Sequence, residues 1–191
     1  MKPGQEAWEH KIKLFWEALK SEFEVRKDPL CGSHIHIAPI GRKYTLDEVK
    51  QIAFAVCYYE PYVVSILPRE RRDNSYCQRN SNVATKMGSL FKQRSPEAWK
   101  MIAKDIKRKG TLEQVCTYLQ GGVGRNHRFV LWNFQNLVAP VVDTRPPSGT
   151  IEFRGGRHLR GKVRTIRWIT FVIVFISMAL REVSSMNRTT S

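Results

Sequence analysis

The apolar and polar positions of the chain follow two different periods, and each period predicts a different kind of element. Apolar residues recur at helical spacing over residues 6–23. Residues 31–37 then alternate between apolar and polar in the manner of a strand, which Pro39 and Gly41 end. Strand-like composition returns twice, over residues 128–138 and 150–154. These segments predict one amphipathic helix and three strands.

Four further segments carry helical patterns with recognisable ends. Thr45 with Glu48 forms a capping box before an apolar-periodic run, and Pro61 is expected to kink or end that helix. Ser95 and Pro96 open another helix, which Gly110 closes. A short helix is expected from Thr111, a last one over about residues 163–184, and a polar connection over residues 68–79.

The order of these elements predicts the fold class. Helices and strands do not alternate regularly, which favours an antiparallel α+β fold over a doubly wound parallel sheet. A chain of 191 residues is long enough to bury one core. We therefore expect an N-terminal helix and connection over residues 1–30, one domain over residues 31–184, and a polar tail over residues 185–191.

Net charge is the unusual feature of the composition. The chain has 32 Lys and Arg against 17 Asp and Glu, a formal net charge of +15. Such an excess attracts polyanions, including nucleic acid, ATP, acidic substrates and anionic lipid. It is equally typical of a solvated basic surface, so charge alone does not choose among these partners.

Cysteine usage and hydropathy bear on the compartment. The four cysteines form no CxxC pair, which indicates reduced, mostly buried thiols in a cytoplasmic protein. The N-terminus lacks the apolar stretch of a signal peptide. The apolar run from Trp168 to Leu180 has 13 residues, whereas a membrane span needs about 20. A core helix and no membrane span are therefore expected.

Two strands carry the sharpest candidate chemistry. His34 and His36 are two apart, so both imidazoles face one side of a strand and could bind a metal or phosphate. Glu152 and Arg154 share a face in the same way, offering a carboxylate for a metal and a guanidinium for an anion. Each pair is also compatible with an ordinary solvated sheet face carrying surface histidines or an ion pair.

Two other segments are weaker candidates. The basic segment of residues 68–77 could form an anion site or an ordinary surface loop. Residues 133–137 carry amides within an apolar strand pattern, and buried amides need partners from the protein or a ligand. Several enzyme motifs are missing: Gly121–Gly124 is not followed by the Lys-Ser/Thr of a phosphate-binding loop, and the chain has no Gly-x-Ser-x-Gly or HExxH.

Taken in order, these segments resemble the amidoligase family of carboxylate–amine ligases. The matching pieces are Cys31 to Ile37, Glu60-Pro61, Pro68-x-x-Arg71-Arg72-x-Asn74-x-Tyr76-Cys77, Asn133 to Leu137 and Thr150 to Arg154. The resemblance covers roughly residues 30–181. It implies an α+β fold similar to glutamine synthetase and glutamate–cysteine ligase, in which an antiparallel sheet carries the ligands of a metal and a nucleotide.

The resemblance also implies an activity and a set of site residues. ATP with Mg²⁺ would activate a small carboxylate, and an amine would attack the resulting acyl phosphate. Glu152, His34 and His36 would bind the metal, while Arg154, Arg71 and Arg72 would act in catalysis. The cofactor would be bound by residues from four segments: His34, His36, Arg154, Asn74 and Asn136.

The chain departs from the family pattern in two places. The family begins with an acidic strand that supplies metal carboxylates, whereas residues 1–30 have the pattern of a helix and a short connection. Gly155 to Gly161 replaces the sequence that often follows the Glu-Phe-Arg strand. We therefore expect a shortened amidoligase with low Mg²⁺ affinity, or alternatively a non-catalytic basic protein that binds nucleic acid or other polyanions. The oligomeric state and the substrates do not follow from the sequence.

Overall fold

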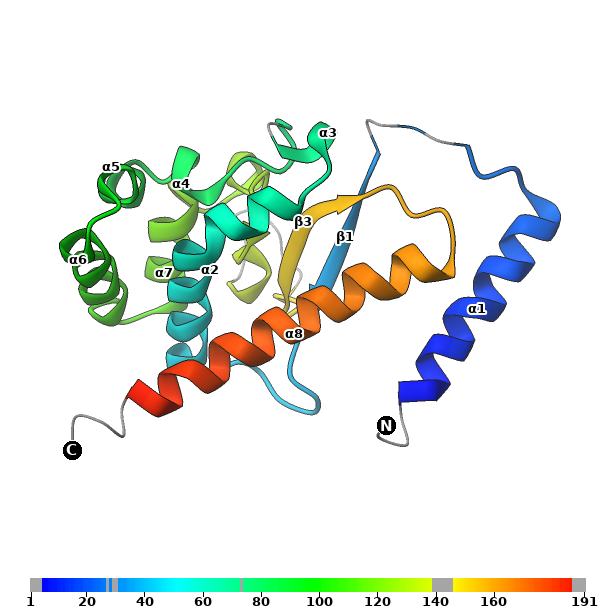
Figure 1. Cartoon of the computed structure of the whole chain (residues 1–191). Coiled ribbons are helices and arrows are strands. Elements are labelled where there is room, and N and C mark those ends of the chain that lie inside the picture. The colour runs from blue at the N-terminus through cyan, green and yellow to red at the C-terminus, as the bar shows by residue number, and fades with distance from the viewer. Residues whose placement is uncertain (1–4, 27, 29–30, 73, 139–145, 187–191) are drawn as a thin grey trace.

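The computed structural model describes residues 5–26, 28, 31–72, 74–138 and 146–186 (Figure 1). It is an α+β structure, as predicted. In chain order the elements are α1 Gln5–Glu22, β1 Gly32–Ile37, α2 Leu46–Ile66, α3 Arg69–Arg72, α4 Asn80–Val83, α5 Thr85–Gln93, α6 Pro96–Lys107, α7 Leu112–Gln120, the 3₁₀ turn η1 Arg125–His127, β2 Trp132–Asn133, the 3₁₀ turn η2 Gln135–Leu137, β3 Ile151–Arg157 and α8 Lys162–Met186.

The described strands form one small antiparallel sheet with β3 at its centre, in the order β1-β3-β2. The register places His36 opposite Glu152 on one side of β3, and Asn133 opposite Glu152 on the other. Residues directly opposite one another point to the same face of a sheet. The register therefore brings the polar residues of all three strands to a common face.

The other face of the sheet is apolar and packs against α8, which crosses in front of β1 and β3 in Figure 1. The rings of Trp132 and Phe153 lie 4.7 Å apart, and Phe175 of α8 stacks on Trp132 at 4.7 Å. Phe153 also contacts Phe171, with ring centroids at 5.4 Å. Because Trp132 and Phe153 are almost fully buried, this aromatic cluster anchors the sheet to α8 and fixes which face remains polar.

Helix α2 is the central helix and contacts α6, α7 and α8. It begins with the predicted capping box, in which Thr45 accepts from the backbone N–H of Glu48 while the Glu48 side chain accepts from the backbone N–H of Thr45. Of the kink or end expected at Pro61, the end does not occur, because α2 continues to Ile66. The last turn is retained because Val63 and Val64 are buried in the core, which offsets the missing backbone hydrogen bond.

Helix α1 lies at the edge of the molecule beside the N-terminal part of α8 (Figure 1). The two helices are joined by a buried hydrogen bond, in which the Trp16 indole of α1 donates to the Thr165 hydroxyl of α8 at 2.9 Å. Phe15 and Phe23 on the same helix are 60% and 66% exposed. Part of the apolar surface that gave α1 its helical pattern is therefore left exposed.

The strand predicted over residues 128–138 is wrong for most of its length, since only Trp132–Asn133 pairs with β3. Buried side-chain amides take the place of a strand ladder. Asn80 accepts from the backbone N–H of Trp132 at 3.1 Å, and Gln120 accepts from that of Phe134 at 2.7 Å. Because side chains satisfy these two backbone N–H groups, the segment can leave the strand ladder and turn into η2.

The segment between α2 and α6 contains more helix than the sequence indicated. Residues 69–72 lie in α3 within the predicted polar connection, and α4 and α5 fill residues that had no predicted element. Helix α5 buries Met87, Leu90 and Phe91 against the core. Three short helices with few apolar residues each give a weak periodic signal, so tertiary packing decides them.

Two other expectations concern cysteines and membranes. All four cysteines are free, and three of them, Cys57, Cys77 and Cys116, are buried, as expected for structural thiols. Among the described residues, Lys162–Arg181 of α8 is long and apolar enough to cross a membrane by length and composition alone. Core helices pass the same test, and one face of this segment packs against the sheet, so the absence of a span stays a prediction.

Asn80 tests the amide bonding that replaces the predicted strand. It is fully buried, donates to the carbonyl groups of Leu119 and Trp132, and accepts from the N–H of Trp132. Asn80→Ala should lower the free energy of unfolding by about 3 kcal/mol, because several buried polar groups lose their partners. Urea denaturation measures this, with exposed Asn82→Ala as the control. Equal stability of the two variants would contradict the role of Asn80.

Candidate functional site on the polar face of the sheet

The polar face of the sheet collects chemistry-bearing side chains from all three strands. His34 and His36 come from β1, Glu152 and Arg154 from β3, and Asn133 from β2. Alternation along each strand turns these side chains away from the buried aromatic cluster. The two histidines, Glu152 and Arg154, which the sequence pattern singled out separately, therefore lie together. We call these five residues, with Thr150 and Asn136 beside them, the polar face.

Glu152 is the centre of this arrangement and is only 4% exposed. Its Oε1 atom lies 2.8 Å from Nη1 of Arg154 and 3.0 Å from Nδ1 of His34, while Nε2 of His36 is 3.7 Å away. Its Oε2 atom accepts from the Asn133 side-chain amide at 2.7 Å. Both carboxylate oxygens are thus bonded to neighbouring side chains, which compensates for burying the charge.

These contacts decide the ionisation of Glu152. Burial by itself raises its pKa, but hydrogen bonds from His34 and Asn133, together with the charge of Arg154, outweigh burial and lower the pKa to about 2. Glu152 is therefore ionised at neutral pH. An ionised carboxylate is an acceptor only, so His34 must present a protonated Nδ1 to it.

Two further hydrogen bonds hold the side chain of Asn133 in place. Gln120 donates to the Asn133 carbonyl oxygen at 3.1 Å, and the backbone N–H of Gln135 donates to the same atom at 3.0 Å. With its oxygen occupied in this way, Asn133 must turn its NH₂ group towards Glu152. Asn133 and Gln120 were not among the predicted site residues, although the buried amides of residues 133–137 had been noted as needing partners.

Arg154 is 6% exposed and is held on several sides. Besides its ion pair with Glu152, its Nε donates to the backbone carbonyl of Tyr76 at 3.1 Å, and its guanidinium lies 5.7 Å from the centre of the Phe129 ring. These contacts fix the guanidinium in the plane where it meets Glu152. In this position Arg154 holds the carboxylate of Glu152 in place.

Arg71 is also buried, at 1% exposed, and reaches the sheet from α3. Its Nη2 donates to the backbone carbonyl of Arg154 at 2.6 Å. The guanidinium lies over Gly32, where an added Cβ would come within 2.6 Å of its Cζ atom. Gly32 is therefore needed for close approach.

His36 leads to the more exposed part of the polar face. Its Nδ1 lies 3.0 Å from the hydroxyl of Thr150 and 3.4 Å from the side-chain amide of Asn136. Thr150 in turn lies 3.0 Å from the hydroxyl of Ser148. Asn136, predicted to bind a cofactor, is therefore next to His36, and Thr150 and Ser148 are polar neighbours that the sequence had not suggested.

Two predicted site residues make their described contacts elsewhere. Arg72 donates to the backbone carbonyls of Leu67 and Ser65, both at 2.9 Å, and so caps the end of α2. Asn74 accepts from the backbone N–H of Tyr76 and donates to the carbonyl of Glu70 within its own turn. The structure thus gives both residues a local structural role, and their catalytic and cofactor roles stay predictions.

Exposure separates the polar face into a supporting layer and an accessible layer. Glu152, Arg154, Asn133 and Arg71 are buried. The side chains of His34 and His36 are 41% and 47% exposed. His34 bonds Glu152 through Nδ1, so Nε2 is the ring nitrogen it can offer to a ligand. An incoming molecule would meet the two imidazoles first and the buried residues through them.

The donor set does not fit a Mg²⁺ ion held by the protein alone. Mg²⁺ prefers oxygen ligands in octahedral geometry, whereas this face has one carboxylate, both of whose oxygens are already bonded. Within the described parts of the chain, no group of three or more His, Cys, Asp or Glu side chains is arranged to hold a metal ion. The low Mg²⁺ affinity expected from the sequence stays a prediction.

The fold and the site define an α+β protein with one polar sheet face organised around a buried carboxylate. The family model described as "Putative amidoligase enzyme" matches residues 5–174, and the chain belongs to this amidoligase family. The matched segment includes α1, which lies outside the stretch of roughly residues 30–181 over which the motifs resemble the family. No curated protein and no solved structure matched the chain. Family membership supports a ligase-like role in broad terms.

The ionisation of Glu152 makes acid stability a test of the site. Because its folded-state pKa is lowered from 4.5 to about 2, the carboxylate stabilises the fold above its unfolded pKa, and this contribution is lost as the pH falls through that window. At neutral pH the free energy of unfolding of the wild type should exceed that of Glu152→Gln by on the order of 3 kcal/mol. This difference should shrink as the pH falls from about 4.5 towards 2.

Chemical denaturation from neutral pH down to about 3 measures this difference. Glu113→Gln, which removes an exposed carboxylate from α7, is the matched control and should follow wild type. A gap between wild type and Glu152→Gln that stays constant with pH would contradict the assigned ionisation of Glu152.

Proposed function

We propose that the protein is an ATP-dependent ligase that joins a small carboxylate to an amine on the polar face. The observation that carries the proposal is the convergence of His34, His36 and Glu152 on one sheet face. Membership of the amidoligase family supports the reaction class. The remaining members of the polar face supply hydrogen-bonding groups of the kind that anionic substrates require.

The proposed reaction has two steps. The substrate carboxylate attacks the γ-phosphorus of ATP, which forms an acyl phosphate and releases ADP. The amine nitrogen then attacks the acyl carbon, the carbon–oxygen bond to phosphate breaks, and inorganic phosphate leaves while the amine loses a proton. Both steps carry concentrated negative charge on phosphate oxygens, so they gain from donors that are already oriented.

The geometry supports particular roles for the residues in this reaction. His34, oriented by Glu152, and His36, oriented by Thr150, contact the phosphate or carboxylate oxygens of the ligands. Asn136 lies beside His36 and can contribute a further donor. Arg154 and Arg71 act as positioning residues, because their burial and their bonds keep the Glu152 carboxylate and strand β3 in place.

A second candidate is a non-catalytic protein that uses the same fold to bind anions. The saturated carboxylate favours it, because a phosphoryl-transfer site needs its counter-ions near the transferred group. The excess of 32 Lys and Arg over 17 Asp and Glu supports anion binding in either case. Turnover distinguishes the two candidates directly.

Hydroxylamine trapping tests for acyl-phosphate formation without knowledge of the natural amine. The protein is incubated with ATP, its magnesium salt and a panel of amino-acid carboxylates, and hydroxamate is measured by its colour with ferric ion. At least one carboxylate should give ATP-dependent hydroxamate. His34→Ala should lower the rate by about 100-fold, the effect of removing an oriented donor from a transition-state anion.

His10→Ala is the matched control, because it removes an exposed histidine from α1 away from the polar face. It should leave the rate unchanged. A well-folded wild type that forms no hydroxamate with any carboxylate would refute the ligase proposal and favour the non-catalytic candidate. Equal activity of wild type and His34→Ala would instead refute the placement of the reaction on the polar face.

A further inference from the structure

A second candidate site lies on the opposite side of the sheet. An open groove of about 850 Å³ runs between the end of α1, the end of α2 and the first turns of α8. Trp168 and Phe171 line it, and both rings contact Phe153 on the apolar face. The groove is therefore separated by the sheet from His34, His36 and Glu152. Nothing in the proposed ligase reaction uses it.

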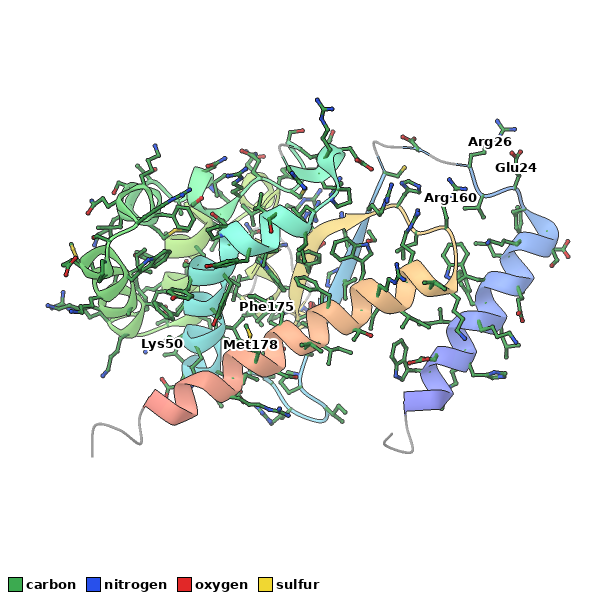
Figure 2. All side chains as sticks on the ribbon, viewed as in Figure 1. Glu24, Arg26, Lys50, Arg160, Phe175 and Met178 are labelled. Atoms are coloured by element: carbon green, nitrogen blue, oxygen red, sulfur yellow. The ribbon has the colours of Figure 1, made fainter. Side chains whose placement is uncertain are left out.

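The charge of the groove is one-sided. Its lining residues include six cations and no Asp or Glu: Lys20, Arg157, Arg160, Lys162, Arg164 and Arg167. One ion pair lies at its border, where Nη2 of Arg157 is 3.4 Å from Oε1 of Glu70. One carboxylate leaves most of this positive charge uncompensated within the described residues. Figure 2 shows Arg160 on the connection between β3 and α8, on the side of α1.

Helix α8 adds to the positive potential. Its N-terminal end carries partial positive charge from unpaired backbone N–H groups, which normally favours acidic side chains in the first turn. The first turn of α8 contains no acidic residue and begins at Lys162. Arg164 lies in the same first turn, and Arg167 follows three residues later, so the two side chains are neighbours on the helix surface. Cations beside the positive end of a helix repel it and so lower the stability of the fold. A bound anion would offset this repulsion.

Repulsion within the cluster is visible in Arg164. Burial lowers the pKa of its guanidinium, and the neighbouring charges of Arg157 and Arg160 lower that pKa further. Its Nη1 donates to the backbone carbonyl of His158 at 3.3 Å. Lys20 approaches from α1, and its Nζ would lie 3.3 Å from a Cβ added at Gly161. Cations from separate elements thus converge on one space.

The groove is also partly apolar and of small-molecule size. Leu67, Pro68, Trp168 and Phe171 line the part that faces the core. A volume of this order is typical of sites for single small ligands, and a mixture of apolar walls with a few charged groups is their usual composition. Size and lining therefore favour a compact ligand over a polymer lying along an open basic surface.

We propose that this groove binds a small organic molecule that carries two or more phosphate groups on an apolar or aromatic body, as a nucleoside diphosphate does. The phosphates contact the arginines at the start of α8 and the backbone N–H groups of its first turn, and the body lies against Trp168 and Phe171. Guanidinium groups bind phosphate oxygens in pairs, which suits a site built mainly from arginine. The site is independent of the ligase reaction.

Calorimetric titration with ADP tests the proposal in metal-free buffer. Wild type should bind one molecule of ADP. The double variant Arg160→Ala/Arg167→Ala removes two exposed side chains from the groove. It should weaken binding by about tenfold or more, because two charge-assisted contacts are lost. Lys100→Ala/Lys104→Ala removes the same charge from exposed positions on α6, at the far side of the molecule (Figure 1), and should bind like wild type.

Three results would overturn the proposal. The first is no ADP binding by wild type. The second is equal weakening by the two double variants, which would mean diffuse attraction to the net charge. The third is binding that survives Arg160→Ala/Arg167→Ala but is lost in His34→Ala/His36→Ala, which would place the nucleotide on the polar face. An inactive ligase with intact ADP binding in the groove would refute the proposed function and leave this site standing.

Discussion

Glu152 brings a negative charge into the centre of the sheet, and the arrangement of the polar face follows from how that charge is compensated. Arg154 supplies the opposite charge at 2.8 Å, Asn133 donates at 2.7 Å and His34 at 3.0 Å. Removing one partner from a buried charge costs far more than a surface ion pair is worth. Each partner is therefore held by its own set of contacts, from Gln120 behind Asn133 to the Tyr76 carbonyl behind Arg154.

The two faces of the sheet depend on each other. The aromatic cluster of Trp132, Phe153 and α8 keeps β3 at the centre and sets its orientation. Because side chains alternate along a strand, fixing Phe153 inwards fixes Glu152 and Arg154 outwards. The buried apolar packing thus determines where the polar chemistry lies. It also separates that chemistry from the basic groove beside α8.

The sequence predicted the structure correctly where the repeat of apolar residues alone determines which face of an element a side chain occupies. Alternation in residues 31–37 and 150–154 predicted that His34 and His36 share one strand face and that Glu152 and Arg154 share another, and the structure agrees. It could not show that the two strands are neighbours, because register depends on pairing between residues more than a hundred positions apart. The roles of Asn80, Gln120 and Asn133 could not be predicted either. A buried side-chain amide that replaces the hydrogen bonds between strands leaves no periodic pattern in the sequence. The family resemblance implied site roles for Arg72 and Asn74, and the sequence could not show the local backbone hydrogen bonds that both also make.

The tautomer of His34 tests the central position of Glu152 most directly. An ionised carboxylate can only accept, so the 3.0 Å contact requires a proton on Nδ1 of His34. Nitrogen-15 NMR of histidine-labelled protein at neutral pH distinguishes the two ring nitrogens, with His34→Gln identifying the signal. The predicted result is a protonated Nδ1 on His34 that is lost or altered in Glu152→Gln. An unprotonated Nδ1, or a spectrum identical in the two proteins, would contradict the claim that Glu152 organises this face.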